Sequence, residues 1–150
     1  MNGESNGAMD ANVELLGEVI YGAAMGQSAC STLIARTSDA EMKGALSDQL
    51  EQYGAVRADA EDQLRAHGRE PVQCRVGEIG LKLGVQLNTL ADTSPSHIAE
   101  MMIEGATMGL IDITRAQHRY AAADAQAAGL AQRLSDIERG GIAYMETRLN

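Results

Sequence analysis

Aromatic residues are scarce in this chain, which has no Phe, no Trp and only four Tyr among its 150 residues. Because 45% of the residues are still hydrophobic, the interior has to be built from Leu, Ile, Val, Met and Ala, as in a globular protein and not a disordered one. Proline is also scarce, with only Pro71 and Pro95. Since proline breaks helices, its scarcity favours long helices, and a chain of this length is expected to form one domain.

Basic residues are outnumbered, with 12 Lys and Arg against 21 Asp and Glu and a formal net charge of −9. Nucleic acids and anionic membranes are bound through basic patches, so we expect neither as a partner. No hydrophobic run approaches the roughly 18 residues of a membrane-spanning helix. The polar residues 1–10 lack the pattern of a signal peptide, and we expect them to form a disordered tail before a single domain over residues 11–150.

The two cysteines, Cys30 and Cys74, lie far apart and lack the Cys-x-x-Cys spacing of redox and metal motifs. A reducing cytoplasm is the simplest setting for such a chain, so a cytoplasmic location is predicted. Cys30 falls on the hydrophobic face of a predicted helix, where we expect it to act as a small buried hydrophobic residue.

Hydrophobic residues recur every three or four positions through most of the chain, which is the spacing of one face of an α-helix. This periodicity predicts helices over residues 11–36, 39–67, 72–91, 95–121 and 124–148, the third being shorter than the others. Asp10 is an expected N-cap, and Thr37-Ser38-Asp39 is expected to form a short turn with a new cap. Gly68 with Pro71 marks a helix end, and Pro95 suits a helix start. No segment alternates as a strand does, so the predicted fold class is all-α.

One short segment occurs twice, as YGAAMG at residues 21–26 and as EGATMG at residues 104–109. Each copy holds a Gly-x-x-x-Gly pattern, which places two glycines on one side of a helix and is expected to allow close approach of another helix. A weaker similarity relates the chain around Glu51 to the chain around Glu138. We therefore expect two related helical hairpins with antiparallel first and fourth helices, formed by residues 11–67 and 95–148.

This layout, together with the stretch IAEMMIEGATMG at residues 98–109, resembles the ferritin-like superfamily and in particular its small uncharacterised bacterial members. The resemblance implies an antiparallel helical bundle of two hairpins joined by a shorter crossover helix. It also implies a site for two iron or manganese ions, to which two helices each give a Glu and two others give Glu-x-x-His. The glutamates at the matching positions are Glu18, Glu51, Glu104 and Glu138.

Two features of the sequence argue against such a metal centre. Gly54 and Gly141 stand where the family has its histidines, so each metal ion would lack a nitrogen ligand. Helical periodicity also turns Glu18, Glu51 and Glu104 away from the hydrophobic faces of their helices, towards solvent or a partner chain. We therefore expect no metal, no other cofactor and no catalytic residue; the alternative is an iron or manganese protein for redox chemistry or storage, with an atypical carboxylate site.

In the absence of the histidines, the hydrophobic side chains of Leu50, Ile137 and methionines are expected to fill the space that an imidazole pair would take. A second alternative function comes from Tyr53-x-x-x-Arg57 and Tyr144-x-x-x-Arg148, which lie on inward faces and would suit a small anionic ligand. Otherwise we expect these arginines to reach the ends of the bundle or to pair with Asp112.

Some large hydrophobic residues lie beside the predicted inward faces instead of within them, among them Tyr21, Met25 and Met108. Exposed hydrophobic groups of this kind often mark a contact with another chain. The sequence therefore predicts a homodimer, and its most economical interpretation is a non-catalytic scaffold or interaction module.

Overall fold

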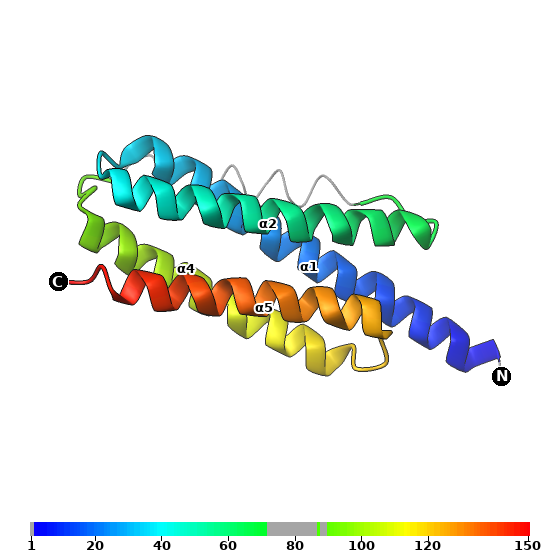
Figure 1. Cartoon of the computed structure of the whole chain (residues 1–150). Helices are drawn as coiled ribbons and strands as arrows, with labels where there is room; N and C mark the ends of the chain where they lie inside the picture. The colour runs from blue at the N-terminus through cyan, green and yellow to red at the C-terminus, as the bar shows by residue number, and fades with distance from the viewer. Residues whose placement is uncertain (1, 72–86, 88–89) are drawn as a thin grey trace.

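The structure is a computed structural model that describes residues 2–71, 87 and 90–150. These residues form an antiparallel bundle of helices (Figure 1), with no strand among them, which confirms the all-α prediction for this part of the chain. The helices are α1 (Asn2–Arg36), α2 (Ala40–Ala66), α4 (Pro95–Arg119) and α5 (Ala125–Glu146). Most of the shorter helix that we expected over residues 72–91 lies outside the described residues.

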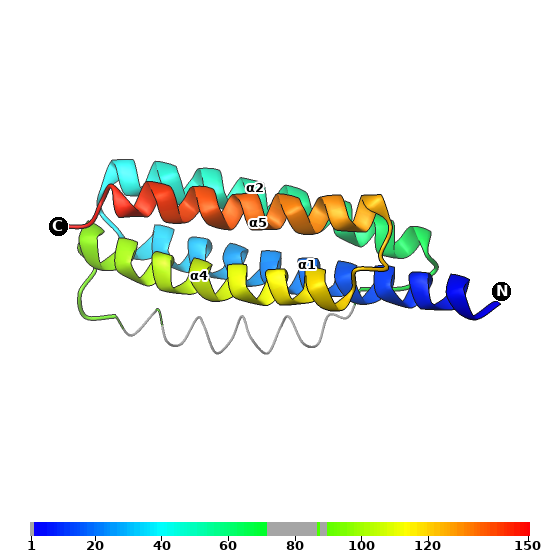
Figure 2. The ribbon, with the colours of Figure 1, turned by 90° about the horizontal axis from the view of Figure 1, so that it is seen from below.

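The direction of the helices follows the expected order. Helices α1 and α5 run one way along the bundle, and α2 and α4 run the other way (Figure 1). In Figure 2, α1 and α4 lie side by side as one layer, and α2 and α5 lie side by side as the other. The first and fourth predicted helices, α1 and α4, are therefore antiparallel, as expected. Arg36 at the end of α1 donates a hydrogen bond to the carbonyl oxygen of Leu90, which holds the chain at that end of the bundle before α4 begins.

Local capping explains most of the helix boundaries. The carboxylate of Asp39 accepts a hydrogen bond from the backbone N–H of Met42 at 2.8 Å, which confirms the cap predicted in the turn at residues 37–39 and identifies Asp39 as the capping residue. Gly68 takes a φ of +76° directly after α2, a conformation that glycine adopts without steric cost. Ser94 caps α4, which has Pro95 in its first turn, and the carboxylate of Asp124 caps α5.

The start of α1 differs from the prediction. The helix begins at Asn2 and not at residue 11, so it runs through the segment that we expected to be a disordered tail. Asp10 is therefore inside the helix, and its assignment as an N-cap was wrong. Residues 2–10 contain no proline, and glycine weakens a helix without forbidding it, so no local signal ends the helix before Ala11.

The core is almost entirely aliphatic, as the composition required. Of the four tyrosines only Tyr53 is buried, with 2% of its surface exposed. Cys30 is fully buried in the same cluster, which confirms its predicted role. The largest fully buried side chains are Leu15, Leu16, Leu33, Met42, Leu46, Ile98, Leu134 and Met145.

Candidate functional site: a cleft between the two hairpins

A cavity of about 510 Å³ lies between α1 and α4, and we call it the α1–α4 cleft. Small-molecule sites in proteins have volumes of about 300–1,000 Å³, so the cleft is large enough for a ligand. Its walls are mostly hydrophobic and rich in methionine, and the side chains that form them include Tyr21, Met25, Leu33, Leu87, Met101, Met102, Met108 and Ile113. The side chain of Met108 is 59% exposed, so the cleft opens to solvent along α4.

The repeated Gly-x-x-x-Gly segments face this cleft from both sides. All four glycines line it: Gly22 and Gly26 from α1, and Gly105 and Gly109 from α4. The two copies of the repeat therefore face one shared space and do not lie on opposite outer faces of the bundle.

The glycines make room for side chains of the neighbouring helices. A Cβ at Gly26 would lie 2.5–2.6 Å from ring carbons of Tyr53, which comes from α2. A Cβ at Gly109 would lie 3.0 Å from Oε2 of Glu138, which comes from α5. A Cβ at Gly22 would likewise lie 2.9 Å from Cδ2 of Leu134 on α5. At Gly105 a Cβ would meet no atom of the described residues within 4 Å. Our expectation that these glycines bring two helices together was thus incomplete, because three of them make room for a side chain and Gly105 leaves the cleft open.

A buried acid–phenol pair forms the floor of the cleft. Glu138 is 4% exposed and Tyr53 is 2% exposed, and the Tyr53 hydroxyl donates a hydrogen bond to the Glu138 carboxylate. Burial raises the pKa of Glu138 from its ordinary 4.5 to about 7, while the hydrogen bond from Tyr53 partly opposes that rise. Burial and then the charge of Glu138 raise the pKa of Tyr53 well above its usual range. Near neutral pH, Glu138 is therefore a group that can take up or release a proton, whereas Tyr53 stays protonated.

The structure brings three of the four candidate glutamates to this cleft. Glu18 from α1 and Glu104 from α4 line it together with Glu138, whereas Glu51 lies on the exposed side of α2 and outside it. Helical periodicity predicted that Glu18, Glu51 and Glu104 all point outward. Glu51 and Glu104 are exposed, whereas Glu18 is half-buried and lines the cleft. Within the described ranges, no three His, Cys, Asp or Glu side chains are placed so that they could hold a metal ion.

Amides occupy the space beside Gly54 and Gly141, the positions where the ferritin-like resemblance led us to look for histidines. A Cβ at Gly54 would lie 3.2 Å from Nε2 of Gln27, and a Cβ at Gly141 would lie 2.5 Å from Nε2 of Gln49. The prediction that Leu50 and Ile137 fill this space was wrong; both are only half-buried. A glycine leaves a notch beside the backbone, and a long, flexible amide on the adjacent helix can lie in it while keeping its polar end hydrogen-bonded.

Gln49 also explains the surroundings of the buried cysteine. The Cys30 thiol lies 3.9 Å from Oε1 of Gln49 and can donate a weak hydrogen bond to it. Burial, followed by the negative charge of Glu138, raises the pKa of this thiol to about 12. Because the thiolate is the reactive form, Cys30 is a structural residue and not a nucleophile.

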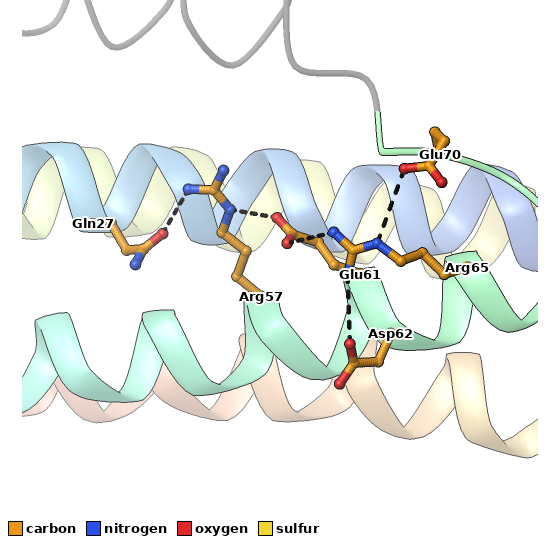
Figure 3. A network of polar contacts seen from close by, with 6 residues as sticks. All are labelled: Gln27, Arg57, Glu61, Asp62, Arg65 and Glu70. Atoms are coloured by element: carbon orange, nitrogen blue, oxygen red, sulfur yellow. Dashed lines mark hydrogen bonds and ion pairs between the residues drawn. The ribbon is translucent and has the colours of Figure 1, made fainter.

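The Tyr and Arg pairs that suggested an anionic ligand do not form one pocket. Arg57 turns to the outside of the α1–α2 hairpin, where it bonds to Gln27 at 2.9 Å and to Glu61 at 2.8 Å (Figure 3). Arg148, which follows α5 in the chain, lies at the N-terminal end of α2, where it pairs with Asp39 and Glu41. Pairing with Asp112 was therefore a wrong expectation, although Arg148 does reach the end of the bundle.

Sequence reasoning missed the contact between Tyr53 and Glu138 and the cleft above it. Two signals pointed that way: the glycine pairs of both repeats, and the position of Glu138 beside the hydrophobic face of its helix. No helix in the described ranges is both long enough and hydrophobic enough to cross a membrane. Comparisons with protein-family models, with curated proteins and with solved structures found no match to this chain, so its function has to be inferred from the cleft itself.

Proposed function

We propose that this protein is a non-catalytic, ferritin-like helical bundle that binds a small, mostly hydrophobic molecule in the α1–α4 cleft. The observation that carries the proposal is the cleft itself, with its volume of about 510 Å³, its methionine-rich walls and a few polar groups at its floor and rim. Sites for small molecules have this composition, in which hydrophobic walls supply affinity and a few polar groups fix orientation.

The ferritin-like assignment is supported by the directions of the helices. Within each hairpin the two helices are antiparallel, and α2 and α4 point the same way (Figure 1). Two hairpins in this relation need one long connection between them, which is the arrangement named for ferritin-like bundles.

We also propose that the protein acts in the cytoplasm as a homodimer. The side chains of Met108 and Ile111 on α4 are 59% and 39% exposed, and large exposed hydrophobic groups often contact a second chain. Light scattering at high micromolar concentration tests this part, and a strict monomer would refute it.

The metal-binding alternative is supported by one observation, the gathering of Glu18, Glu104 and Glu138 around one cleft. Metal analysis of protein purified without a chelating tag decides between it and the proposal. Iron or manganese bound in a fixed ratio, and lost in a Glu138→Gln variant, would favour the alternative.

Ligand binding is tested with Nile red, a neutral hydrophobic dye that fluoresces in apolar surroundings. We expect saturable binding to the wild-type protein and its loss in Gly105→Leu, because a leucine there would extend into the cleft from a backbone position that has free space. Gly129→Leu is the matched control. Gly129 is also an exposed helix glycine with no atom within 4 Å of a Cβ, and it lies on α5 outside the cleft lining. Equal dye binding by both variants would place the binding elsewhere and refute the proposal.

A further inference from the structure

The outer face of α4 carries two exposed hydrophobic residues near its middle. Among the residues that the structure describes, four large hydrophobic side chains are exposed, and two of them, Met108 and Ile111, are three positions apart on α4. Residues at this spacing lie side by side on one face of a helix. The other two, Met9 and Leu149, lie near the two ends of the chain. Met108 and Ile111 therefore form a small hydrophobic patch on the surface of α4.

Charged residues extend this patch in both directions along the helix. A series with steps of four, four, three, four and four residues stays on one face of a helix. Six exposed residues of α4 follow this series, and we call them the α4 stripe: Glu100, Glu104, Met108, Ile111, Arg115 and Arg119. Its two acidic residues come before the hydrophobic pair, and its two basic residues come after it.

Most charges of the α4 stripe have no partner within the chain. Among the residues that the structure describes, Glu104, Arg115 and Arg119 make no ion pair. Glu100 has one contact, at 3.7 Å from Nδ1 of His97. The side chains of the stripe are therefore available to another molecule.

The order of these residues makes the α4 stripe complementary to itself. Three pairs stand at equal distances before and after its midpoint, namely Met108 with Ile111, Glu104 with Arg115, and Glu100 with Arg119. In a two-fold symmetric dimer the same surface is used by both chains. If two copies of α4 pack antiparallel across an axis at this midpoint, each residue faces its counterpart in the other copy. Acidic residues then meet basic ones, and hydrophobic residues meet at the centre.

We infer that α4 docks a second copy of this chain, antiparallel across a two-fold axis, with Met108 and Ile111 at the centre and Glu104 against Arg115 of the second copy. This inference rests on the proposed homodimer and assigns the face that it uses. The charges also select the direction of pairing. Two parallel copies would place like charges opposite one another along the whole stripe, and such contacts are repulsive across an interface.

The size of the α4 stripe indicates how tight the dimer is. Residues 100–119 cover about 30 Å of helix, on a cylinder about 10–12 Å wide. Stable protein interfaces bury about 800 Å² on each partner, and a single helix face of these dimensions buries less. We therefore expect a dissociation constant in the micromolar range.

Charge reversal tests the pairing in the full-length protein. Glu104→Arg alone and Arg115→Glu alone each bring like charges together at both symmetric contacts. Each should raise the dissociation constant of the dimer at least about 10-fold, as measured by analytical ultracentrifugation. A mixture of the two variants should recover the wild-type affinity as a heterodimer, because both contacts of the mixed dimer then join opposite charges.

Matched controls reverse two exposed charges on another helix. Lys43→Glu and Glu51→Arg lie on α2, which is diagonally across the bundle from α4 (Figure 2). Alone or mixed, they should leave the dissociation constant unchanged. Circular dichroism checks the helix content of every variant. If a reversal unfolds the chain, Glu104→Gln and Arg115→Gln replace it; each removes the ion pair at both contacts and should weaken the dimer about 3-fold or more, and an unchanged affinity would overturn the inference.

Failure of this inference and failure of the proposed function give different results. If the wild type forms a dimer that neither reversal weakens, the homodimer uses another face and only the inference is wrong. The same holds if both variants are monomers and their mixture stays monomeric. If the wild type is a strict monomer at high micromolar concentration, both the homodimer and the inference are wrong. Ligand binding is judged separately by the Nile red titration.

Discussion

Replacement of Gly26 by alanine should destabilise the protein, whereas the same replacement at Gly105, in the second copy of the repeated segment, should stabilise it. A Cβ at Gly26 would lie 2.5–2.6 Å from three carbons of the Tyr53 ring, and non-bonded carbons prefer a separation of about 3.5–4.0 Å. The ring is held in place, because Tyr53 is 2% exposed and its hydroxyl is bonded to Glu138. At Gly105 the added methyl group meets no atom within 4 Å in the part of the chain that the structure describes.

The size of each effect follows from two opposing contributions. Alanine is favoured over glycine inside a helix by about 1 kcal/mol, and this gain applies at both positions. At Gly26 it is opposed by overpacking of the core, which costs about 1–3 kcal/mol, and by displacement of the Tyr53 hydrogen bond to a buried carboxylate, which is worth about 1–3 kcal/mol. We expect a net loss of about 1–3 kcal/mol for Gly26→Ala and a gain of about 0.5–1 kcal/mol for Gly105→Ala.

Urea unfolding followed by helical circular dichroism measures both changes. A Tyr53→Leu background provides a further control, because removal of the ring should remove most of the penalty at Gly26; the double-mutant cycle should then report a coupling of about 1 kcal/mol or more. If Gly26→Ala is as stable as Gly105→Ala in the wild-type background, Tyr53 does not pack on Gly26, and our description of the floor of the cleft is wrong.

Two further predictions concern buried polar groups. Because the folded protein raises the pKa of Glu138 from 4.5 to about 7, it binds this proton more tightly than the unfolded chain does, and stability should fall as the pH rises through that interval. Between pH 5 and pH 8 the wild-type protein should lose about 2–3 kcal/mol relative to Glu138→Gln; parallel stability profiles from urea unfolding would contradict the raised pKa. Asn12, 7% exposed on α1, donates to the Asp124 carboxylate at 3.0 Å and accepts from its backbone N–H at 2.6 Å, so Asn12→Ala should cost about 1–3 kcal/mol by leaving these groups unpaired. A melting temperature unchanged from the wild type would show that water replaces the asparagine at no cost.

The parts of the fold that the sequence predicted are those that local chemistry decides. Asp39 accepts a bond from a residue three positions on, and Gly68 takes a positive φ at the end of α2, so each acts within one helical turn. The start of α1 escaped prediction because nothing local in residues 2–10 ends a helix.

The site was less accessible to prediction, because it depends on how the helices are rotated and placed against one another. Periodicity showed that the glycines of each repeat share a face and that Glu138 lies beside a hydrophobic face. It carried no information on how far α2 and α5 are shifted along the bundle axis relative to α1 and α4. This shift determines that Tyr53 packs over Gly26 and that Glu138 lies beside Gly109. For the same reason it missed the amides of Gln27 and Gln49 beside Gly54 and Gly141.

The glycine lining of the cleft has a consequence for how this protein can diverge. The shape of the cleft is set in part by side chains that are missing, and at Gly105 a new side chain would enter free space without moving the backbone. A single change from glycine to alanine, serine or valine there would alter which molecules fit while raising, not lowering, the helical propensity of α4. On the ligand-binding function proposed above, selectivity would therefore change in single steps that carry no penalty in helical propensity.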